Sequence, residues 1–572
     1  MRLDSRASIS CHEWLHKKHA PNSFPGLVPD PENAVAEEFK EQGKIHELKV
    51  IEGLKVHFKN LVQVDINASR EEQQLQTADA LLAPESEVIV GADIGEICEA
   101  EIGRKLGVVL SDSPRASRPD LLIKLGSDSA DKPFWAPVDI KSHKALDATK
   151  SNKAWLSTLP NFSPADGEEI GGKFETEDLH QLAHYSRHLQ TLGLASPGLW
   201  TGIIGRDLET IAWSKISEVV LGVGAKQTLA LTQYDQEFEI AFDLVRAAMT
   251  ENQNPLQASG IIAENMPGKM GCTLCEYKLT CLSEMENYPG GGHITLLASV
   301  TPKIVGKSMP GIKSIDELLQ ATPINDDMIK SQIRGRVWKS QVPEILDPSS
   351  PLDLPEFDIE IDIDLENSME ALRELEISEP IGEDRLYLYG YGILDRTVSK
   401  DWRKAKIETV SDYSNTDVGE YEIMLTVWEK LQSEVAKAEA AGKSIGIFHY
   451  SPHERTWWNK FAKKYQGQAG VPSEAEVLNF TTQYFVDLLT YTRKISFPTM
   501  GYSIKLLAKV ANFSWAVKDP GGAGSLLKYK TATSKVASKQ EQEEAIAWLD
   551  SYNRDDVRAT FAVREYVRSL KF

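Results

Sequence analysis

Apolar and polar residues alternate along the chain in two rhythms, one typical of helices and one typical of strands. In the first half, an amphipathic pattern over residues 34–58 predicts a helix, and a second helical pattern covers about 174–192. Short apolar runs at 87–91, 121–124 and 138–141 predict strands between these helices. Helices that flank a small mixed sheet account for this order.

A turn-rich stretch separates this first half from the rest of the chain. Residues 287–292 read NYPGGG, and a proline followed by three glycines interrupts regular structure. Residues 293–340 have the apolar spacing of short helices joined by a turn at Pro310 and Gly311, and the Pro-rich run 343–355 predicts an extended linker. This middle segment resembles a helix-hairpin-helix connector, although a plain spacer fits it equally well.

Strand and helix patterns return after the linker. Apolar runs at 357–363, 385–394 and 444–450 predict strands, and most of the remainder has helical periodicity. We therefore expect an α/β multi-domain chain with a first domain at 1–286, a helical connector at 287–350 and a further α/β domain at 351–572.

Length and composition place the chain among soluble globular proteins. It has 572 residues, of which 41% are hydrophobic and 26% charged, so several domains with packed cores are expected. No run approaches the roughly 18 apolar residues that a membrane span needs, and the N-terminal MRLDSRASISCHEW lacks the apolar segment of a signal peptide. These patterns predict a cytoplasmic protein without membrane contact.

The net charge narrows the choice of function. With 63 basic and 84 acidic residues the chain carries −21, which argues against a protein that coats nucleic acid electrostatically. It does not argue against an enzyme that gathers carboxylates around divalent metal ions. The stretch 351–380 alone holds eleven acidic residues and one Arg.

The first chemical constellation lies in the first half. Asp120 follows Arg118–Pro119 and leads into the apolar run LLIK, and the strand-like run APVDIKSHK presents Asp139 and Lys141. Because residues two apart on a strand share a face, Asp139 and Lys141 point the same way and can converge with Asp120. Carboxylates suit Mg²⁺ or Mn²⁺, and a lysine can orient a metal-activated water. Taken alone, an exposed, charged strand end gives the same D-x-K pattern.

Further residues in the right order give the pattern a family resemblance. His46 lies in GKIHE on the first predicted helix, and Gln181 and Tyr185 are four apart in HQLAHY, on one helical face. Together with the first constellation they resemble the RecB-like branch of the PD-(D/E)xK nuclease superfamily, which has a restriction-endonuclease-like fold. The resemblance implies that His46, Asp120 and Asp139 are metal ligands and that Lys141 is the catalytic lysine. It implies that Gln181 and Tyr185 contact the DNA backbone or support the site.

The cysteines extend this resemblance. Cys272 and Cys275 form C-x-x-C, and Cys281 follows in GCTLCEYKLTC, whereas Cys98 lies in a helix-like run and fits a buried position. Three thiolates leave a tetrahedral set one ligand short, and Cys11 is the candidate for the fourth. One distant cysteine plus a C-terminal triplet resembles the iron–sulfur nucleases of the same branch, which implies a structural [4Fe–4S] cluster. The spacing alone also fits zinc.

A second constellation lies beyond the linker. FDIEIDI places Asp358 and Glu360 on one strand face, SIGIFHYSPHE ends in His449 and Glu454, and SYNRDDVRAT puts Tyr552 and Asp556 four apart on a helix. The order resembles the DnaQ-type, RNase H-like exonucleases with a DEDD metal site. The resemblance implies that the metal ligands are Asp358, Glu360, Glu454 and Asp556 and that Tyr552 belongs to the catalytic set.

The middle motif departs from that family. Where the family pattern has N-x-x-x-F-D, this chain has HYSPHE, so Glu454 stands in place of Asp, and Asp487 in FVDLL is a reserve candidate. A degenerate domain that is kept for DNA binding or architecture is the alternative interpretation.

Two other patterns concern phosphate binding. The glycines of DPGGAGS at 519–525 are not followed by Gly-Lys-Ser/Thr, so no ATP site is expected in this chain. Four lysines without neighbouring acids form the best local basic patch for a DNA strand, with a solvated surface loop as the alternative: Lys528, Lys530, Lys535 and Lys539.

Taken together, these motifs predict a metal-dependent DNA nuclease that acts as an exonuclease on single-stranded ends. DNA repair, recombination or phage defence would be its setting, with a separate helicase or defence-system subunit as partner. Two alternatives remain open: a largely non-catalytic DNA-binding or scaffold subunit of a helicase–nuclease or CRISPR-type complex, and an RNase.

Overall fold

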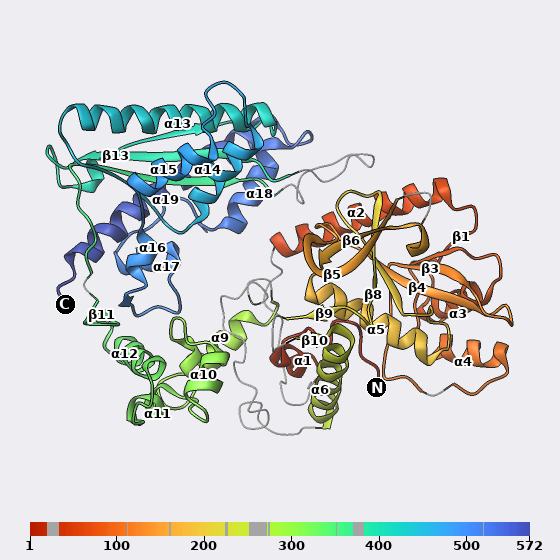
Figure 1. Cartoon of the computed structure of the whole chain (residues 1–572). Coiled ribbons are helices and arrows are strands. Elements are labelled where there is room, and N and C mark those ends of the chain that lie inside the picture. The colour runs from red at the N-terminus through yellow and green to blue at the C-terminus, as the bar shows by residue number, and fades with distance from the viewer. Residues whose placement is uncertain are drawn as a thin grey trace. The chain divides into compact units, whose positions relative to one another are not determined.

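The structure is a computed structural model. It describes residues 1–19, 34–110, 112–158, 162–222, 227–250, 272, 275–350, 352–369, 383–518 and 520–572. These residues fall into two compact units (Figure 1). The first unit contains the described residues up to 250, apart from Ala34 and Val35, and the second contains those from 272 onward. No described helix is both long and apolar enough to cross a membrane.

The first unit is built on an eight-stranded mixed sheet in the order β1-β2-β3-β4-β7-β8-β5-β6. β3 and β4 form an antiparallel pair, and β4 runs parallel to β7. The strands are β1 (Leu61–Gln63), β2 (Val88–Val90), β3 (Leu121–Ser127), β4 (Pro133–Ile140), β5 (Asp147–Thr158), β6 (Glu168–Lys173), β7 (Trp200–Ile204) and β8 (Thr210–Lys215). The strands predicted at 87–91, 121–124 and 138–141 correspond to β2, β3 and the end of β4.

Helices cover both faces of this sheet. Leu121 and Val138 pack with Leu54 of α2, whereas Leu122 and Trp135 pack with Leu189 of α5. Side chains alternate along a strand, so Asp120 and Asp139 share the α5 face with Leu122 and Trp135. The helices are α1 (His12–His19), α2 (Ala34–His57), α3 (Arg70–Leu82), α4 (Glu96–Leu106), α5 (Thr176–Thr191) and α6 (Ala230–Thr250).

The second unit begins with a small helical cluster. Ile294, Met309, Ile315 and Leu318 belong to its core, and the predicted turn at Gly311 has φ +84°. The Pro-rich segment that follows is not purely a linker, because its short strand β11 (Glu344–Ile345) pairs with β17 (Ile495–Ser496). The helices are α9 (Lys278–Glu286), α10 (Pro302–Ser308), α11 (Ile315–Gln320) and α12 (Asp326–Ser340).

A five-stranded sheet in the order β14-β13-β12-β15-β16 forms the centre of the second unit. β12, β15 and β16 are parallel neighbours, and β13 is antiparallel to both β12 and β14. The strands are β12 (Ile359–Asn367), β13 (Leu386–Asp395), β14 (Lys406–Ser411), β15 (Ile445–His449) and β16 (Phe485–Asp487). The three strands predicted here correspond to β12, β13 and β15, and β12 continues four residues further than predicted.

Two long helices lie on opposite faces of this sheet (Figure 1). Ile361, Ile363 and Leu365 of β12 pack toward α13 and α14, so the even-numbered side chains of β12 face α19. A Cβ on Gly392 of β13 would come within 2.7 Å of Phe561 in α19, so the glycine permits close packing. The helices are α13 (Asp417–Ala440), α14 (His453–Lys464), α15 (Glu474–Tyr484), α16 (Leu488–Thr492), α17 (Ile504–Val510), α18 (Gly522–Thr533) and α19 (Lys539–Ser569).

Candidate functional site

The face of β12 that meets α19 carries an acid at every second position. This acid ladder consists of Asp358, just before the strand, and Glu360, Asp362, Asp364 and Glu366 within it. Since strand side chains alternate, all five carboxylates point to the same side of the sheet. Which of them can hold a metal ion therefore depends on the groups of other elements that face them.

The first part of the ladder is occupied by protein groups. Asp358 accepts hydrogen bonds from the backbone N and Oγ of Ser444, both at 2.9 Å, and these bonds lower its pKa. Glu360 forms ion pairs with Arg564, at 2.9 Å from Oε2, and with Arg568, at 2.7 Å from Oε1. Arg564 also pairs with Asp362. Burial favours the neutral form of Glu360, but Arg564 and Arg568 hold its pKa below the usual value. Protein groups therefore already occupy Asp358 and Glu360, whereas Asp362 Oδ1 is buried without a hydrogen-bond partner among the described residues, and burial raises the pKa of Asp362 to about 7.

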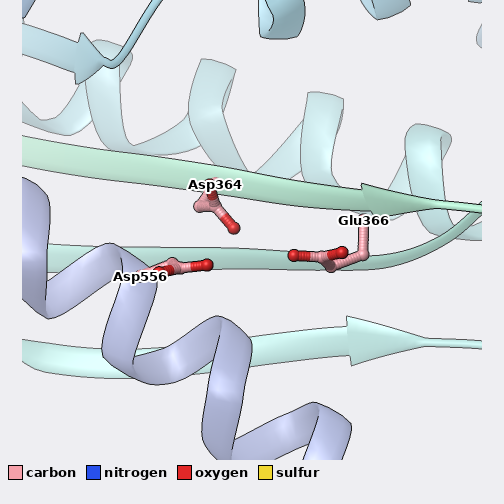
Figure 2. Close-up of side chains that lie close together, drawn as sticks. All are labelled: Asp364, Glu366 and Asp556. Carbon is pink, nitrogen blue, oxygen red and sulfur yellow. The ribbon is translucent and has the colours of Figure 1, made fainter. Parts of the chain in front are cut away.

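The other end of the ladder has the opposite character. Oxygen atoms of Asp364, Glu366 and Asp556 lie within 4.8 Å of one another, and we call these residues the carboxylate triad. Figure 2 shows the two side chains from β12 and that of Asp556 from α19 pointing toward each other. The sequence predicts Asp358 and Glu360 beside Asp556, whereas the structure brings Asp364 and Glu366 there.

Burial and mutual repulsion raise the pKa values of the triad. Burial, Asp556 and Glu366 raise the pKa of Asp364 well above its usual value. Burial and Asp556 raise the pKa of Glu366 to about 8. Burial also raises the pKa of Asp556, although Lys505 opposes that shift. Neighbouring carboxyl groups raise one another's pKa because two negative charges at close range repel each other. A divalent cation bound between them removes this repulsion.

Polar groups from two elements fix the triad in place. Asn553 Nδ2 donates to Asp364 Oδ2 at 2.7 Å, and Trp515 Nε1 donates to Asp556 Oδ1 at 2.8 Å. The Tyr552 hydroxyl donates to the Asp556 carboxylate, and burial together with the triad acids raises the pKa of this phenol. The four-residue spacing of Tyr552 and Asp556 on α19 places both on one helical face, as predicted from the sequence.

Glu454 supplies a fourth acid next to the triad. It lies in the first turn of α14, the residue is 3% exposed, and its negative charge contributes to the raised pKa of Asp364. Glu454 Oε2 lies 3.3 Å from His449 Nδ1. The turn before it contains Ser451 at φ +91°, a strained backbone conformation for a residue with a side chain. The reserve candidate Asp487 instead accepts the backbone N–H groups of Leu489 and Ser451.

The sequence contains a signal for the residues that were missed. FDIEIDIDLEN holds two D-x-E patterns, at 358–360 and at 364–366, on the same strand face. Periodicity cannot separate them, because a shift of six residues conserves the face. The distinguishing residues are the arginines of α19, which lie some 200 positions away in the chain and neutralise Glu360 of the first pattern.

The first unit gathers the residues of the other predicted site. Lys141 Nζ lies 3.4 Å from Asp139 Oδ2 and 3.5 Å from Asp178 Oδ1, and it donates to Gln181 Oε1 at 2.8 Å. Gln181 Nε2 donates to the Tyr185 hydroxyl at 2.8 Å, and that hydroxyl donates to the backbone carbonyl of Arg118 at 3.1 Å. The helix α5 thus holds the lysine beside the end of β4.

The acids of this first-unit site also crowd one another. Asp139 is 0% exposed, and among the described residues neither of its carboxylate oxygens accepts a hydrogen bond. Burial, Asp139 and Glu47 raise the pKa of Asp120 well above its usual value, although Ile140 N donates to Asp120 Oδ2 at 2.8 Å. Glu47, on α2, is an acid that the sequence reasoning missed, and burial and Asp139 raise its pKa.

His46 lies next to Glu47 on α2 and is 3% exposed. Burial lowers its pKa, and the nearest polar groups include the backbone of Gly205 and Lys141, which follow β7 and β4. A neutral imidazole is the form that binds metal ions. The six residues that the resemblance assigns to this site therefore lie around the end of β4.

The cysteines are divided between the units. Cys11 precedes α1 in the first unit, and Cys272, Cys275 and Cys281 belong to the second. The backbone N–H of Tyr277 donates to Cys275 Sγ at 3.4 Å. Among the described residues, no three cysteine sulfur atoms lie within 4.8 Å of one another. Cys98 lies on α4 and is buried in the core, and burial raises the pKa of its thiol.

The predicted basic patch lies on and after α18. Lys528 and Lys530 belong to this helix, Lys535 follows it, and Lys539 begins α19. Asp519 of the glycine-rich segment lies outside the described residues, and the segment continues into α18.

Fold and site together define a class. An antiparallel β12-β13-β14 meander extended by parallel β15 and β16, with acids on the central strand and on the packed helix α19, is the arrangement of an RNase H-like nuclease domain. Residues 396–568 match the model of the RNase H superfamily, a range that includes Glu454, Tyr552 and Asp556 and begins after β12. The chain thus contains a C-terminal RNase H-like domain, which indicates a nuclease-type activity. Searches of curated proteins and of solved structures found no match.

Proposed function

We propose that the chain is a metal-dependent nuclease whose RNase H-like domain hydrolyses phosphodiester bonds at the carboxylate triad. The observation that carries this proposal is the convergence of Asp364, Glu366 and Asp556 on the sheet of that domain. Carboxylate oxygens are the preferred ligands of Mg²⁺ and Mn²⁺, so the triad fits such an ion, with Glu454 as a further ligand on the side of Asp364. A bound ion would polarise a phosphate oxygen and activate a water molecule.

The protein groups around the triad support this chemistry. Tyr552 keeps its proton at neutral pH, and its pKa is raised further by burial and the triad acids. Its single O–H donates to Asp556 in this structure and would turn to a water molecule or a phosphate oxygen once ion and substrate are bound. Asn553 and Trp515 fix the orientation of Asp364 and Asp556. A site that is held by its own hydrogen bonds needs little reorganisation when charge develops on the phosphate.

The test compares two acids of the acid ladder. The full chain is incubated with end-labelled single- and double-stranded DNA and RNA, with Mn²⁺, Mg²⁺ or EDTA. Asp364→Asn should remove the products of this domain from the metal-dependent ladder, whereas Asp358→Asn should keep the wild-type ladder because Asp358 binds Ser444 at the other end of the acid ladder. An unchanged ladder in Asp364→Asn would reject the proposed site.

We further propose that the substrate is DNA with single-stranded ends, degraded from the 3′ side. The family resemblance of the second constellation supports this choice, and the lysine series at 528–539 offers a nearby basic surface. The RNA arm of the same experiment decides against it if RNA is degraded faster. DNA repair, recombination or phage defence, beside a separate helicase or defence-system subunit, is the setting that follows from a DNA end-processing activity.

A second proposal concerns the first unit, as a RecB-like nuclease site of the PD-(D/E)xK type. Its support is the contact of Lys141 with Asp139, Asp178 and Gln181, and the burial of Asp139, whose oxygens accept no hydrogen bond among the described residues. Mg²⁺ or Mn²⁺ would be held by Asp120 and Asp139 with His46 or Glu47, and Lys141 would offset charge on the phosphate.

Variants in an Asp364→Asn background isolate this first-unit activity. Asp139→Asn and Lys141→Met should each remove residual cleavage, by about 10²–10³-fold for the lysine. Lys144→Met is the matched control, since Lys144 is exposed three residues away. If Asp364→Asn already removes all cleavage, the first unit is a binding or scaffold part and its catalytic role is withdrawn.

A further inference from the structure

The carboxylate triad has one ion-pair partner among the described residues, Lys505 of α17. Its ammonium group pairs with Asp556 Oδ1, the same oxygen that accepts the indole N–H of Trp515. The nearby arginines Arg396, Arg564 and Arg568 pair with the first part of the acid ladder, and their contacts go to Glu360, Asp362 and Glu565. Among the described residues, Lys505 is therefore the one cation that forms an ion pair with the triad.

The ammonium group of Lys505 is held in place rather than free to move in solvent. Nζ lies 4.4 Å from the ring centroid of Trp515 and 4.2 Å from that of Tyr552. A cation between two aromatic faces is attracted to both, most strongly where water is partly excluded. Two rings and one carboxylate oxygen thus fix the position of a positive charge beside the triad.

A centre that works with two divalent ions needs room for both on its carboxylates, about 3.5–4 Å apart. In this chain, Asp556 Oδ1 is already taken by Lys505 and Trp515. Asp364 and Glu366 have no such cation among the described residues, and Asn553, which donates to Asp364, is neutral. The charges around the triad are therefore asymmetric. Lys505 pairs with Asp556 on α19, whereas Asp364 and Glu366 on β12 have no cation paired with them among the described residues.

We propose that Lys505 takes the place of one of the two divalent ions of such a centre, so that the domain binds a single ion, on Asp364 and Glu366, beside a fixed ammonium group. This inference rests on the proposed function of the RNase H-like domain. The ammonium stays on Asp556 when the ion binds and presents its positive charge to the phosphate group of the substrate.

Counting bound ions tests the proposal without relying on activity. The full chain, carrying Asp120→Asn and Asp139→Asn to remove the acids of the first unit, is titrated with Mn²⁺, and free Mn²⁺ is followed by electron paramagnetic resonance. The ions of this site are those lost on adding Asp364→Asn. One ion is expected with Lys505 present, and two with Lys505→Met, the first of them bound about tenfold tighter because a nearby positive charge has been removed.

Matched variants separate the charge from the fold. Lys505→Arg, which keeps the charge, should still bind one ion, and so should Lys509→Met, which changes an exposed lysine of the same helix. If Lys505→Met fails to fold by circular dichroism, Lys505→Gln replaces it.

The possible results are distinguishable. Two ions in the chain with Lys505, or an ion count and affinity that do not respond to Lys505→Met, would overturn this inference and leave the proposed function standing. A chain that binds no Mn²⁺ dependent on Asp364 would reject both.

Discussion

At the level of single residues, the acids of β12 differ in the charges that face them. Asp358 and Glu360 meet hydrogen-bond donors and arginines, whereas Asp364 and Glu366 meet another acid, Asp556. The carboxyl groups are chemically alike, so the opposite directions of their pKa shifts come from their surroundings. Hydrogen bonds and arginines lower the pKa of Asp358 and Glu360, whereas burial together with Asp556 raises that of Asp364 and Glu366.

The raised pKa of Glu366 predicts how stability depends on pH when ions are absent. The folded state binds a proton up to about pH 8, whereas the unfolded chain releases it near the usual value of 4.5. Between these values the folded state holds more protons, so the free energy of unfolding falls as pH rises. In EDTA, Glu366→Gln should raise the melting temperature at pH 8, by about 2–4 °C per kcal/mol recovered, and change it little at pH 4.5.

Differential scanning calorimetry at both pH values measures this effect. Asp358→Asn is the control, because its carboxylate has a lowered pKa and its neutralisation should not raise the melting temperature at any pH. Equal melting temperatures for the wild type and Glu366→Gln at pH 8 would contradict the repulsion described for the triad.

Tyr552 gives a second prediction at this scale. Tyr552→Phe removes a hydroxyl that donates to Asp556 but leaves the ring beside Lys505. We expect cleavage to slow by about 10²-fold while Mn²⁺ affinity stays within a few-fold, because the tyrosine acts on water or substrate rather than on the ion. Parallel measurement of single-turnover rates and Mn²⁺ binding decides this. A loss of affinity that matches the loss of rate would assign Tyr552 to ion binding instead.

At the level of elements, alternation along a strand was the most informative property of the sequence. Apolar runs predict β2, β3, β12, β13 and β15, and alternation predicts that Asp139 and Lys141 share a face, as they do beside α5. It could not fix where β12 ends, since acids and apolar residues continue to alternate through Glu366. The choice between the two D-x-E patterns depends on how α19 lies against β12, a long-range contact that no local pattern encodes.

The close packing of α19 on β13 provides a test at this scale. A Cβ on Gly390 would come 2.1 Å from Asn553 Oδ1 and 3.0 Å from Val557, and Asn553 is the residue that holds Asp364. Gly390→Ala should therefore destabilise the fold by about 1–3 kcal/mol and also weaken Mn²⁺ binding. Chemical denaturation and Mn²⁺ titration measure the two effects. Gly306→Ala, with nothing within 4 Å of its new Cβ, should change neither.

At the level of the whole molecule, the chain combines two compact units that each gather acids around a lysine. In the first unit the lysine lies at the end of the strand that carries the acid, and in the second it comes from a neighbouring helix. The proposed activities can therefore be separated by single substitutions, Asp139→Asn in one unit and Asp364→Asn in the other.

The cysteines give the prediction that concerns the whole chain. If Cys11, Cys272, Cys275 and Cys281 hold a [4Fe–4S] cluster, protein purified without oxygen should be brown, because iron–thiolate charge transfer absorbs visible light and zinc does not. Cys275→Ser should bleach and destabilise it. Cys98→Ser should leave the colour unchanged, since Cys98 lies in a hydrophobic core. A colourless protein that contains one zinc ion per chain by metal analysis would reject the iron–sulfur cluster and indicate a zinc site.

The acid ladder also has a consequence for synthesis of the chain. Asp364 and Asp556 are 192 positions apart, so β12 is made long before α19 can cover it. During that interval one face of the strand carries five carboxylates, and inward-facing charge discourages the pairing of such a strand with other chains. We expect a chain shortened before residue 539 to remain monomeric in sedimentation although it lacks Asp556, whereas the same chain with Asp362 and Asp364 changed to Val should aggregate. The residues that later hold a metal ion would thus first keep an unfinished sheet soluble.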